Sequence, residues 1–184
     1  MRQRKPGTPA CIGLGSNLGQ RPLQLERALE GLGQFPATRL TAWSRAWVTR
    51  PWGQTRQPRF WNAAALLHTD LTPLRLLRHL LALEWQLGRR RGGRRRWCPR
   101  AIDLDLLLYG NQRICQVGLR VPHPWLHRRA FALAPLVDID PGWLVPGRGA
   151  ARRLLQLTVD ATAQPATRIL RPVPVDTRHR QTSA

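Results

Sequence analysis

An arginine-rich segment leads directly into an apolar run that contains two aspartates one residue apart. Residues 89–96 hold six arginines and two glycines, and residues 102–109 (Ile-Asp-Leu-Asp-Leu-Leu-Leu-Tyr) have the composition of a buried strand. Side chains two positions apart on a strand project from the same face, with their Cα atoms roughly 6–7 Å apart. Asp103 and Asp105 are therefore expected side by side, as two oxygen ligands for a divalent cation.

Two interpretations compete for this aspartate pair. Ionised carboxylates in an apolar strand are costly unless they are paired or bound to a metal, so the upstream arginines could simply form a structural salt bridge with Asp103 and Asp105. The loop, however, holds more arginines than two acids can use. Mg²⁺ prefers one or two carboxylates together with phosphate oxygens, and arginine matches the geometry of phosphate. We therefore favour a polyphosphate substrate over a structural ion pair.

The length and hydropathy of the chain predict one soluble domain. A chain of 184 residues can bury a core that is stable unaided. No segment approaches the ~20 consecutive apolar residues of a membrane span, and the charged start leads into a strand rather than into the apolar part of a signal peptide. We expect a domain over residues 9–160, a loose tail over 1–8 and a C-terminal extension over 161–184 whose last part is disordered.

Cysteine usage and charge bear on the surroundings of the protein. Cys11, Cys98 and Cys115 show no CxxC spacing and leave one thiol unpaired under any pairing, so we expect reduced thiols and a cytoplasmic location. The formal charge of +20 would hold nucleic acid nonspecifically at low salt. Lys5 is the one lysine among the 30 basic residues, however, and such an arginine bias also follows from coding composition. The net charge alone therefore does not decide whether the protein binds nucleic acid.

Hydrophobic spacing predicts strands and helices in mixed order. Expected helices cover residues 22–33, 73–87 and 151–157, with a further short helix that carries Arg129 and Phe131. Expected strands lie within residues 9–14, 38–49, 59–69, 102–109 and 114–121, the last as a returning hairpin strand. Residues 13–19 are expected to form a tight glycine-rich turn, and the acidic residues 137–141 a solvated loop.

Two further patterns are compatible with a binding site. Phe60 and Asn62 share one face of an expected strand, where they could stack on and hydrogen-bond to a flat heterocycle, although core packing explains these two residues somewhat better on their own. His123 lies between two prolines, which hold its backbone extended and its side chain in a fixed direction. A purely structural role for His123 is the alternative.

Taken in order, these motifs resemble the 6-hydroxymethyl-7,8-dihydropterin pyrophosphokinase family. They are the Gly-Ser-Asn turn at 15–17, the Phe-x-Asn strand at 60–62, the helix ending near Glu84, the arginine loop running into Trp-Cys-Pro-Arg-Ala-Ile-Asp-Leu-Asp at 97–105, and Val-Pro-His-Pro at 121–124. The resemblance covers about residues 10–160. It implies an α+β, ferredoxin-like sandwich with an antiparallel sheet, helices on its faces and mobile active-site loops. It also implies transfer of the pyrophosphoryl group of ATP to the hydroxymethyl oxygen of the pterin, with release of AMP.

The resemblance assigns roles to particular residues. Two Mg²⁺ ions would be held by Asp103 and Asp105, and ATP is the co-substrate. Catalytic contacts to phosphate are implied for Arg89, Arg91, Arg100 and His123. ATP-binding residues would be Glu84, Arg89, Arg91, Arg96, Trp97, Arg100, Leu106, His123 and Arg129. Pterin-binding residues would be Thr49, Trp52, Phe60, Asn62 and Phe131. The chain departs from the family pattern at Cys98, where Gly is usual, at Arg50, where Pro is usual, and in an arginine loop one residue longer.

A different class of function remains as an alternative. An arginine-rich nucleic-acid-binding protein would use residues 89–96 as a phosphate clamp and its tryptophans for stacking, with steep salt dependence and no need for Asp103 or Asp105. The chain shows no convincing Ser-His-Asp or Cys-His arrangement, which suits phosphoryl-type transfer because that chemistry needs positioning and charge neutralisation. We expect a monomer that binds ATP and the pterin, with no membrane contact and no specific nucleic acid.

Overall fold

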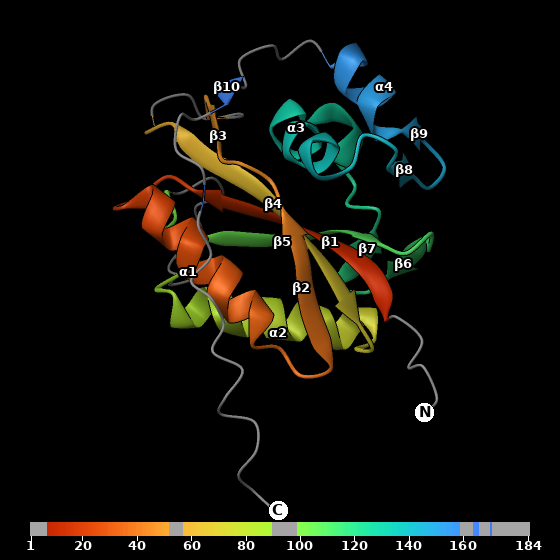
Figure 1. Ribbon diagram of the computed structural model, residues 1–184, viewed down its shortest axis with the longest axis horizontal. Helices are drawn as coiled ribbons and strands as arrows, with labels where there is room; N and C mark the ends of the chain where they lie inside the picture. Colours follow the sequence, from red (N-terminus) through yellow and green to blue (C-terminus); the bar gives the residue numbers. More distant parts are fainter. Residues whose placement is uncertain (1–6, 52–56, 90–98, 159–163, 166–169, 171–184) are drawn as a thin grey trace, which may run out of the picture.

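The computed structural model describes residues 7–51, 57–89, 99–158, 164–165 and 170. Its centre is an antiparallel sheet in which strand β1 lies between β4 and β5 (Figure 1). The sheet strands are β1 (Thr8–Ser16), β2 (Thr38–Trp43), β3 (Trp47–Thr49), β4 (Phe60–Thr69), β5 (Asp103–Tyr109) and β10 (Gln164–Pro165). Both β2 and β3 pair with β4, and β10 pairs with β3, so residues of the expected C-terminal extension add an edge to the sheet.

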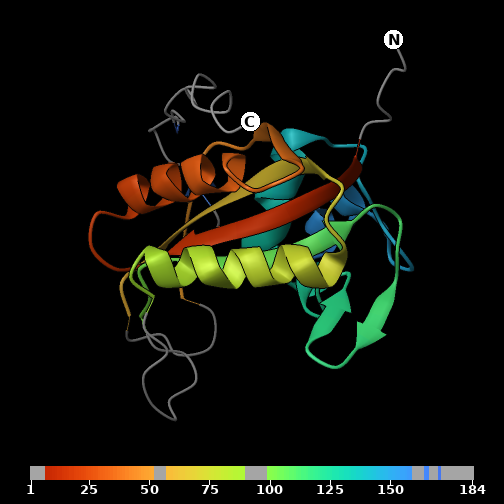
Figure 2. The ribbon, with the colours of Figure 1, turned by 90° about the horizontal axis from the view of Figure 1, so that it is seen from below.

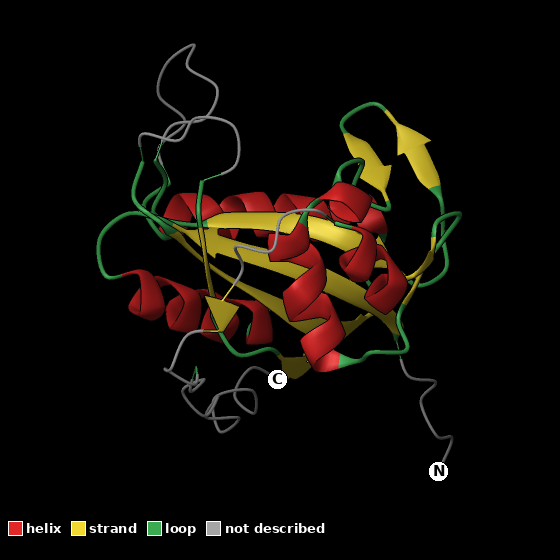
Figure 3. Ribbon diagram, turned by 90° about the horizontal axis from the view of Figure 1, so that it is seen from above, coloured by secondary structure: helices red, strands yellow, loops and turns green. Residues whose placement is uncertain are grey.

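Helices cover both faces of this sheet (Figures 2 and 3). One face carries α1 (Arg21–Gly33) and α2 (Pro73–Gln86), and the other carries α3 (Ala130–Ile139) with α4 (Ala151–Leu157). A 3-10 turn, η1 (Leu126–Arg128), precedes α3. Two small hairpins, β6 (Ile114–Gln116) with β7 (Leu119–Val121) and β8 (Leu144–Val145) with β9 (Gly149–Ala150), stand beside the second layer. None of the helices in the described part of the chain is long and apolar enough to span a membrane.

The two long helices form where the sequence predicts them. Helix α1 has Pro22 in its first turn and buries Leu25, Ala28, Leu29 and Leu32, which recur at helical spacing. Helix α2 is capped by Thr72, whose hydroxyl accepts a hydrogen bond from the backbone N–H of Arg75, three residues on. The apolar stripe of each helix therefore faces the sheet.

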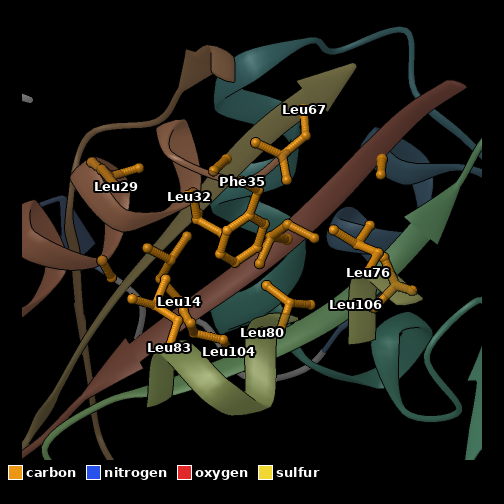
Figure 4. Close-up of a cluster of buried hydrophobic side chains, with 14 of the residues drawn as sticks. Leu14, Leu29, Leu32, Phe35, Leu67, Leu76, Leu80, Leu83, Leu104 and Leu106 are labelled. Atoms are coloured by element: carbon orange, nitrogen blue, oxygen red, sulfur yellow. The ribbon is translucent and has the colours of Figure 1, made fainter. Parts of the chain in front are cut away.

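The main core fills the space between these helices and the sheet (Figure 4). Alternate residues of β1, β4 and β5 point into it, among them Ile12, Leu67 and Leu106. Each fully buried leucine or isoleucine contributes about 1.5–3 kcal/mol relative to an exposed side chain. This face of the sheet is largely apolar and carries much of the stability of the fold.

The opposite face of the sheet is divided between packing and open surface. Toward one end, Cys11, Ala64, Leu107 and Leu108 pack against α3, α4 and η1 in a second core cluster. Toward the other end, the same strands present glycines, polar groups and carboxylates instead of apolar side chains. The strands that point apolar side chains into the first core therefore leave part of the second face without apolar side chains.

Several sequence predictions need correction. Strand β1 continues through Gly13 and Gly15 to Ser16, so the expected glycine-rich turn begins at residue 17 rather than at residue 13. Residues 114–121 do not return to the main sheet as one strand, because they fold back on themselves at Gly118, whose φ of 78° is the left-handed conformation that glycine tolerates. The acidic segment 137–141 is helical up to Ile139, and Asp138 forms an ion pair with Arg45 (3.0 Å). Residues 38–49 form two strands rather than one.

Candidate active site

A cavity of about 280 Å³ opens on the second face of the sheet. Its walls come from β1, β3, β4 and β5, from the start of α3, and from the segments around residues 89, 100 and 123. Ten of the predicted site residues line it: Thr49, Phe60, Asn62, Arg89, Arg100, Asp103, Asp105, His123, Arg129 and Phe131. Residues up to 82 positions apart in sequence are thus brought to one hollow.

The floor of the cavity is the bare backbone of β1. Gly13 and Gly15 lie two apart on this strand and both line the cavity. Gly15 pairs with Asn62 on one side and with Asp103 on the other, and a Cβ placed on it would lie 3.1 Å from Asn62 Oδ1. The missing side chains leave room for a ligand to lie across three strands. Sequence reasoning assigned these glycines to a turn, although their two-residue spacing is the signal for one face of a strand.

Asp103 is held by two arginines. Its Oδ1 accepts a hydrogen bond from Arg89 Nη1 at 2.5 Å, and its Oδ2 accepts one from Arg100 Nη1 at 2.6 Å. This is the pairing that the salt-bridge interpretation predicts, and it places both guanidinium groups at the cavity wall. Because an arginine can satisfy a carboxylate and a phosphate together, the same geometry suits a phosphate ligand.

Glu84 lies beneath this group rather than on the cavity surface. Only 2% of the residue is exposed, and its Oε1 accepts hydrogen bonds from the backbone N–H of Leu104 (2.7 Å) and from Arg89 Nη1. Burial raises the pKa of Glu84, an effect that the Leu104 N–H and the Arg89 charge oppose. For Arg89 burial lowers the pKa, but the charges of Asp103 and Glu84 outweigh it and the pKa is raised. Glu84 therefore anchors Arg89 from below.

Asp105 occupies a different environment from Asp103. Burial raises its pKa to about 7, the nearby Asp103 charge adds to this, and the Arg129 charge acts in the opposite direction. These surroundings disfavour the charged form of Asp105, so a cation bound beside it would stabilise that carboxylate strongly. The described residues contain no cluster of three or more His, Cys, Asp and Glu side chains that could cage a metal. Two carboxylates nevertheless fit Mg²⁺, which keeps waters and phosphate oxygens as its other ligands.

His123 is held in one orientation. Its backbone N–H donates to the carbonyl of Leu107 on β5 (2.9 Å), and its Nδ1 accepts from the backbone N–H of Trp125 (3.3 Å). Burial first, and the Arg129 charge second, lower its pKa to about 4, against a smaller opposing effect of Asp103. The ring is therefore neutral at pH 7 and carries its proton on Nε2, as a hydrogen-bond donor.

The other end of the cavity combines an amide with two aromatic rings. Asn62 is buried and donates from Nδ2 to Thr49 Oγ1 (2.8 Å), which fixes which way its amide points. Phe60 and Phe131 line the same hollow, and the Arg129 guanidinium lies 5.5 Å from the Phe131 ring centre. The arrangement can hold a flat, polar-edged heterocycle.

Asn17 is a site residue that sequence reasoning did not single out. It is almost fully buried at the end of β1 and makes both backbone and side-chain contacts to Arg100: Asn17 N donates to Arg100 O (3.2 Å), and Asn17 Oδ1 accepts from Arg100 N (2.7 Å). Its Nδ2 also donates to Gln57 Oε1 (3.1 Å). Asn17 thus fixes Arg100 and links it to the loop before β4. Its place in the Gly-Ser-Asn motif is the only signal in the sequence.

Leu106 lines a second hollow, of about 720 Å³, next to the cavity. Leu77 and the β6–β7 hairpin form much of this second hollow, and Asp105 and His123 line both hollows. Asp105 and His123 therefore stand at the junction of two adjoining spaces. Four predicted residues, Trp52, Arg91, Arg96 and Trp97, lie outside the described residues, as does Cys98.

Comparison with known sequences decides the family. The sequence model described as 7,8-dihydro-6-hydroxymethylpterin-pyrophosphokinase (HPPK) matches residues 11–141. The chain belongs to the HPPK family. Among curated relatives, a 2-amino-4-hydroxy-6-hydroxymethyldihydropteridine pyrophosphokinase of Methylorubrum extorquens is 41% identical over 150 residues, which cover 82% of this chain and 94% of that protein. The enzyme of the same name from Pseudomonas aeruginosa is 44% identical over 135 residues, 73% of this chain and 82% of that protein.

Solved structures confirm the fold expected for an HPPK domain. The structure of an HPPK-DHPS in complex with substrates superimposes with a TM-score of 0.70 at 13% identity, over 88% of this chain and 47% of that one. The wild-type Plasmodium falciparum HPPK-DHPS with pteroate gives a TM-score of 0.69 at 12% identity, over 89% of this chain and 48% of that one. The chain thus spans about half the length of these solved chains. Its fold is the predicted ferredoxin-like α+β sandwich.

Proposed function

We propose that this HPPK-family protein transfers the pyrophosphoryl group of ATP to 6-hydroxymethyl-7,8-dihydropterin, in the biosynthesis of folate. The hydroxymethyl oxygen forms a bond to the β-phosphorus of ATP, and the bond from that phosphorus to the α,β-bridging oxygen breaks. The products are AMP, the pterin diphosphate and one proton. Family membership, together with relatives that carry this activity in their names, supports the assignment.

The observation that carries the proposal is the row Asn62–Gly15–Asp103 across three strands. The aromatic and amide side chains proposed for the heterocycle and the arginines and carboxylates proposed for the phosphates line one cavity, and in this row only a glycine lies between Asn62 and Asp103. An acceptor bound at one end would thus lie directly beside phosphate bound at the other. Such positioning supplies a large part of the rate in phosphoryl-type transfer.

At the acceptor end, Phe60 and Phe131 would hold the pterin ring between them, and Asn62 would hydrogen-bond to its polar edge. Thr49 accepts from Asn62 Nδ2 and so leaves Asn62 Oδ1 to face the ligand side, next to Gly15. Because this hydrogen bond already holds the Asn62 side chain, little side-chain entropy would be lost when the pterin binds.

At the phosphate end, Arg89 and Arg100 would turn their remaining donors to the phosphate chain, and His123 would donate to it from Nε2. Asp103 and Asp105 would hold Mg²⁺, as two ions in our proposal. Bound Mg²⁺ supplies neutralisation of phosphate charge and polarisation of the hydroxyl group. The adjoining hollow with Leu106 would take the rest of the nucleotide.

The remaining sequence predictions stay part of the proposal. We assign Arg91, Arg96 and Trp97 to ATP, Trp52 to the pterin, and the catalytic domain to residues 9–160. Because one chain supplies both ends of the cavity, we propose that it acts as a monomer, in the cytoplasm.

The reaction is tested by measuring AMP formed from ATP and Mg²⁺ with and without 6-hydroxymethyl-7,8-dihydropterin. We expect AMP only when the pterin is present. Asp105→Asn should lower kcat by roughly 10³-fold, because loss of a metal ligand removes several kcal/mol of transition-state stabilisation. Asp140→Asn, which changes an exposed aspartate outside the cavity, is the matched control.

Two outcomes would count against the proposal. Near-normal turnover of the Asp105→Asn protein would remove Asp105 from the metal site. Absence of pterin-dependent AMP, combined with salt-sensitive binding of RNA or DNA, would favour the nucleic-acid alternative instead.

A further inference from the structure

A third hollow, of about 700 Å³, lies beside the β6–β7 hairpin. It is bounded by that hairpin, by the segment from residue 121 to η1, and by the turn between β8 and β9; Figure 1 shows the two hairpins that border it. We call it the basic groove. It shares His123 with the catalytic cavity, but Phe60, Asn62 and Asp103 do not line it. It also shares Cys115, Arg120, His123 and Pro124 with the hollow that Leu106 lines.

The basic groove has an apolar floor and a cationic rim. Val121, Leu126 and Val145 are buried and form part of its base. Arg113 and Arg148 line it and are exposed. Arg120 and His127 line it as well, whereas no aspartate or glutamate is among the described residues that do so. With His123, five basic side chains thus line one space, and no acidic side chain is among its described lining residues.

The rim is a built arrangement rather than a scatter of surface charges. The guanidinium group of Arg113 crosses from the turn before β6 to the β8–β9 turn, where it packs so closely on Gly147 that a Cβ there would lie 3.3 Å from Arg113 Cζ. Gly147 has a φ of 74°, a conformation that favours glycine, and its missing side chain leaves room for the Arg113 guanidinium. Arg148 follows directly and acts electrostatically on His127 across the groove.

Cations gathered in a hollow repel one another, so an anion that bridges them is favoured. Arginine binds phosphate through paired N–H donors, and several arginines around one space match several linked phosphates better than a single carboxylate. We propose that the basic groove is a second anion site, which binds a polyphosphate chain while the catalytic cavity is occupied. The chain is either inorganic or the phosphate tail of a nucleotide, since both present the same charged oxygens.

The test uses the full-length protein with the catalytic cavity filled by Mg²⁺ and a non-hydrolysable ATP analogue. Inorganic triphosphate is then titrated by calorimetry, and the ring resonances of His127 are followed by NMR, assigned with His127→Gln. We expect one further triphosphate to bind and the pKa of His127 to rise, because the anion offsets the Arg148 charge. His127 lines this groove alone among the three hollows.

The double variant Arg113→Ala/Arg148→Ala should weaken triphosphate binding at least tenfold. Both side chains are exposed and line neither of the other hollows, so the fold and the pterin-dependent activity should be kept. The matched control Arg27→Ala/Arg39→Ala removes two exposed arginines elsewhere and should bind triphosphate as the wild type does. Equal affinity for triphosphate and GTP would show that the groove recognises the phosphates alone. Tighter binding of GTP would show that the ligand of the groove is a nucleotide.

The proposal is overturned if no triphosphate binds beyond the catalytic cavity. It is also overturned if both double variants lose affinity equally, since binding would then follow net charge rather than this groove. Because binding is measured without turnover, failure here leaves the proposed reaction untouched.

Discussion

Gly15 controls how deep the catalytic cavity is. Its backbone φ lies outside the left-handed region, so alanine can replace it without backbone strain. The new Cβ would lie 3.1 Å from Asn62 Oδ1, on the floor where the pterin is proposed to lie. We expect Gly15→Ala to raise the KM for the pterin about tenfold, equivalent to ~1.4 kcal/mol, as measured by steady-state AMP formation.

Gly142→Ala provides the control for that change. A Cβ on Gly142 would also lie 3.1 Å from a side-chain oxygen, that of Asp140, but in an exposed turn away from the cavity. The KM for the pterin should not change in this variant. If both variants raised it equally, the glycine floor would have no specific role.

His123 makes the stability of the fold depend on pH. Its pKa is lowered to about 4 in the folded state, against about 6.5 in an unfolded chain. Between these values the unfolded state binds more protons, so the free energy of unfolding falls as the pH drops from 6.5 to 4, by up to about 3 kcal/mol from this group. Urea unfolding of His123→Gln at pH 7 and at pH 4.5 should show a smaller difference than the wild type shows.

His68→Gln is the comparison for this experiment, because His68 lies on β4 outside the cavity. It should keep the wild-type dependence on pH. An identical pH dependence in the wild type and both variants would show that His123 does not carry the effect.

At this scale the sequence predicts the acids better than the glycines. Asp103 and Asp105 are two apart on a strand, and strand alternation alone puts both on one face, as found in the cavity. Gly13 and Gly15 have the same spacing, but glycine is also the usual turn residue, so their local chemistry points to the wrong element. The burial of Glu84 depends on Leu104 and Arg89, neither of which its own helix reveals.

Among the elements, the end of β1 joins two segments of the site through Asn17. Replacement by alanine would remove the acceptor for the Arg100 N–H and the donor to Gln57, and it would leave a buried polar group unpaired. We expect Asn17→Ala to lower the free energy of unfolding by about 1–3 kcal/mol. It should also lower kcat, because Arg100 is no longer held beside Asp103.

Gln57→Ala separates the two contacts of Asn17, because it removes the acceptor for Asn17 Nδ2 and keeps both groups of the Asn17–Arg100 hydrogen bond. We expect it to leave kcat closer to the wild-type value than Asn17→Ala does. Thermal unfolding and AMP formation measured on both proteins check this. Equal loss of kcat in the two variants would mean that the Gln57 contact, not the Arg100 contact, matters for turnover.

The sequence predicts an element correctly where its apolar residues recur at one spacing without a break. Helices α1 and α2 keep a helical apolar spacing from a proline at the start to the end, and each forms as expected. The expected strand over residues 38–49 is broken at Ser44, whose hydroxyl accepts from the backbone N–H of Ala64 and whose own N–H donates to the Ala64 carbonyl. Such long-range pairing has no signature in the local sequence.

For the molecule as a whole, Cys11 reports on global unfolding. It is fully buried on β1 between the two layers, and burial strongly raises the pKa of its thiol, whereas Cys115 is exposed on β6. In a Cys98→Ser protein, we expect a thiol reagent to modify Cys115 within minutes and Cys11 only as the whole fold opens. The rate at Cys11 should rise with urea in step with the loss of helical signal. Fast modification in native buffer would contradict this.

The unequal faces of the sheet have a practical consequence. Because α1 and α2 rest on a largely apolar face, while the cavity occupies the uncovered part of the other, substrate preference and thermal tolerance are set mainly by different sets of positions. A library that varies Thr49, Phe60 and Phe131 can therefore be screened for acceptors of new shape while the core beneath α1 and α2 is left unchanged. A second library, which varies core residues beneath α1 and α2, can raise thermal stability without changing the residues that line the acceptor pocket.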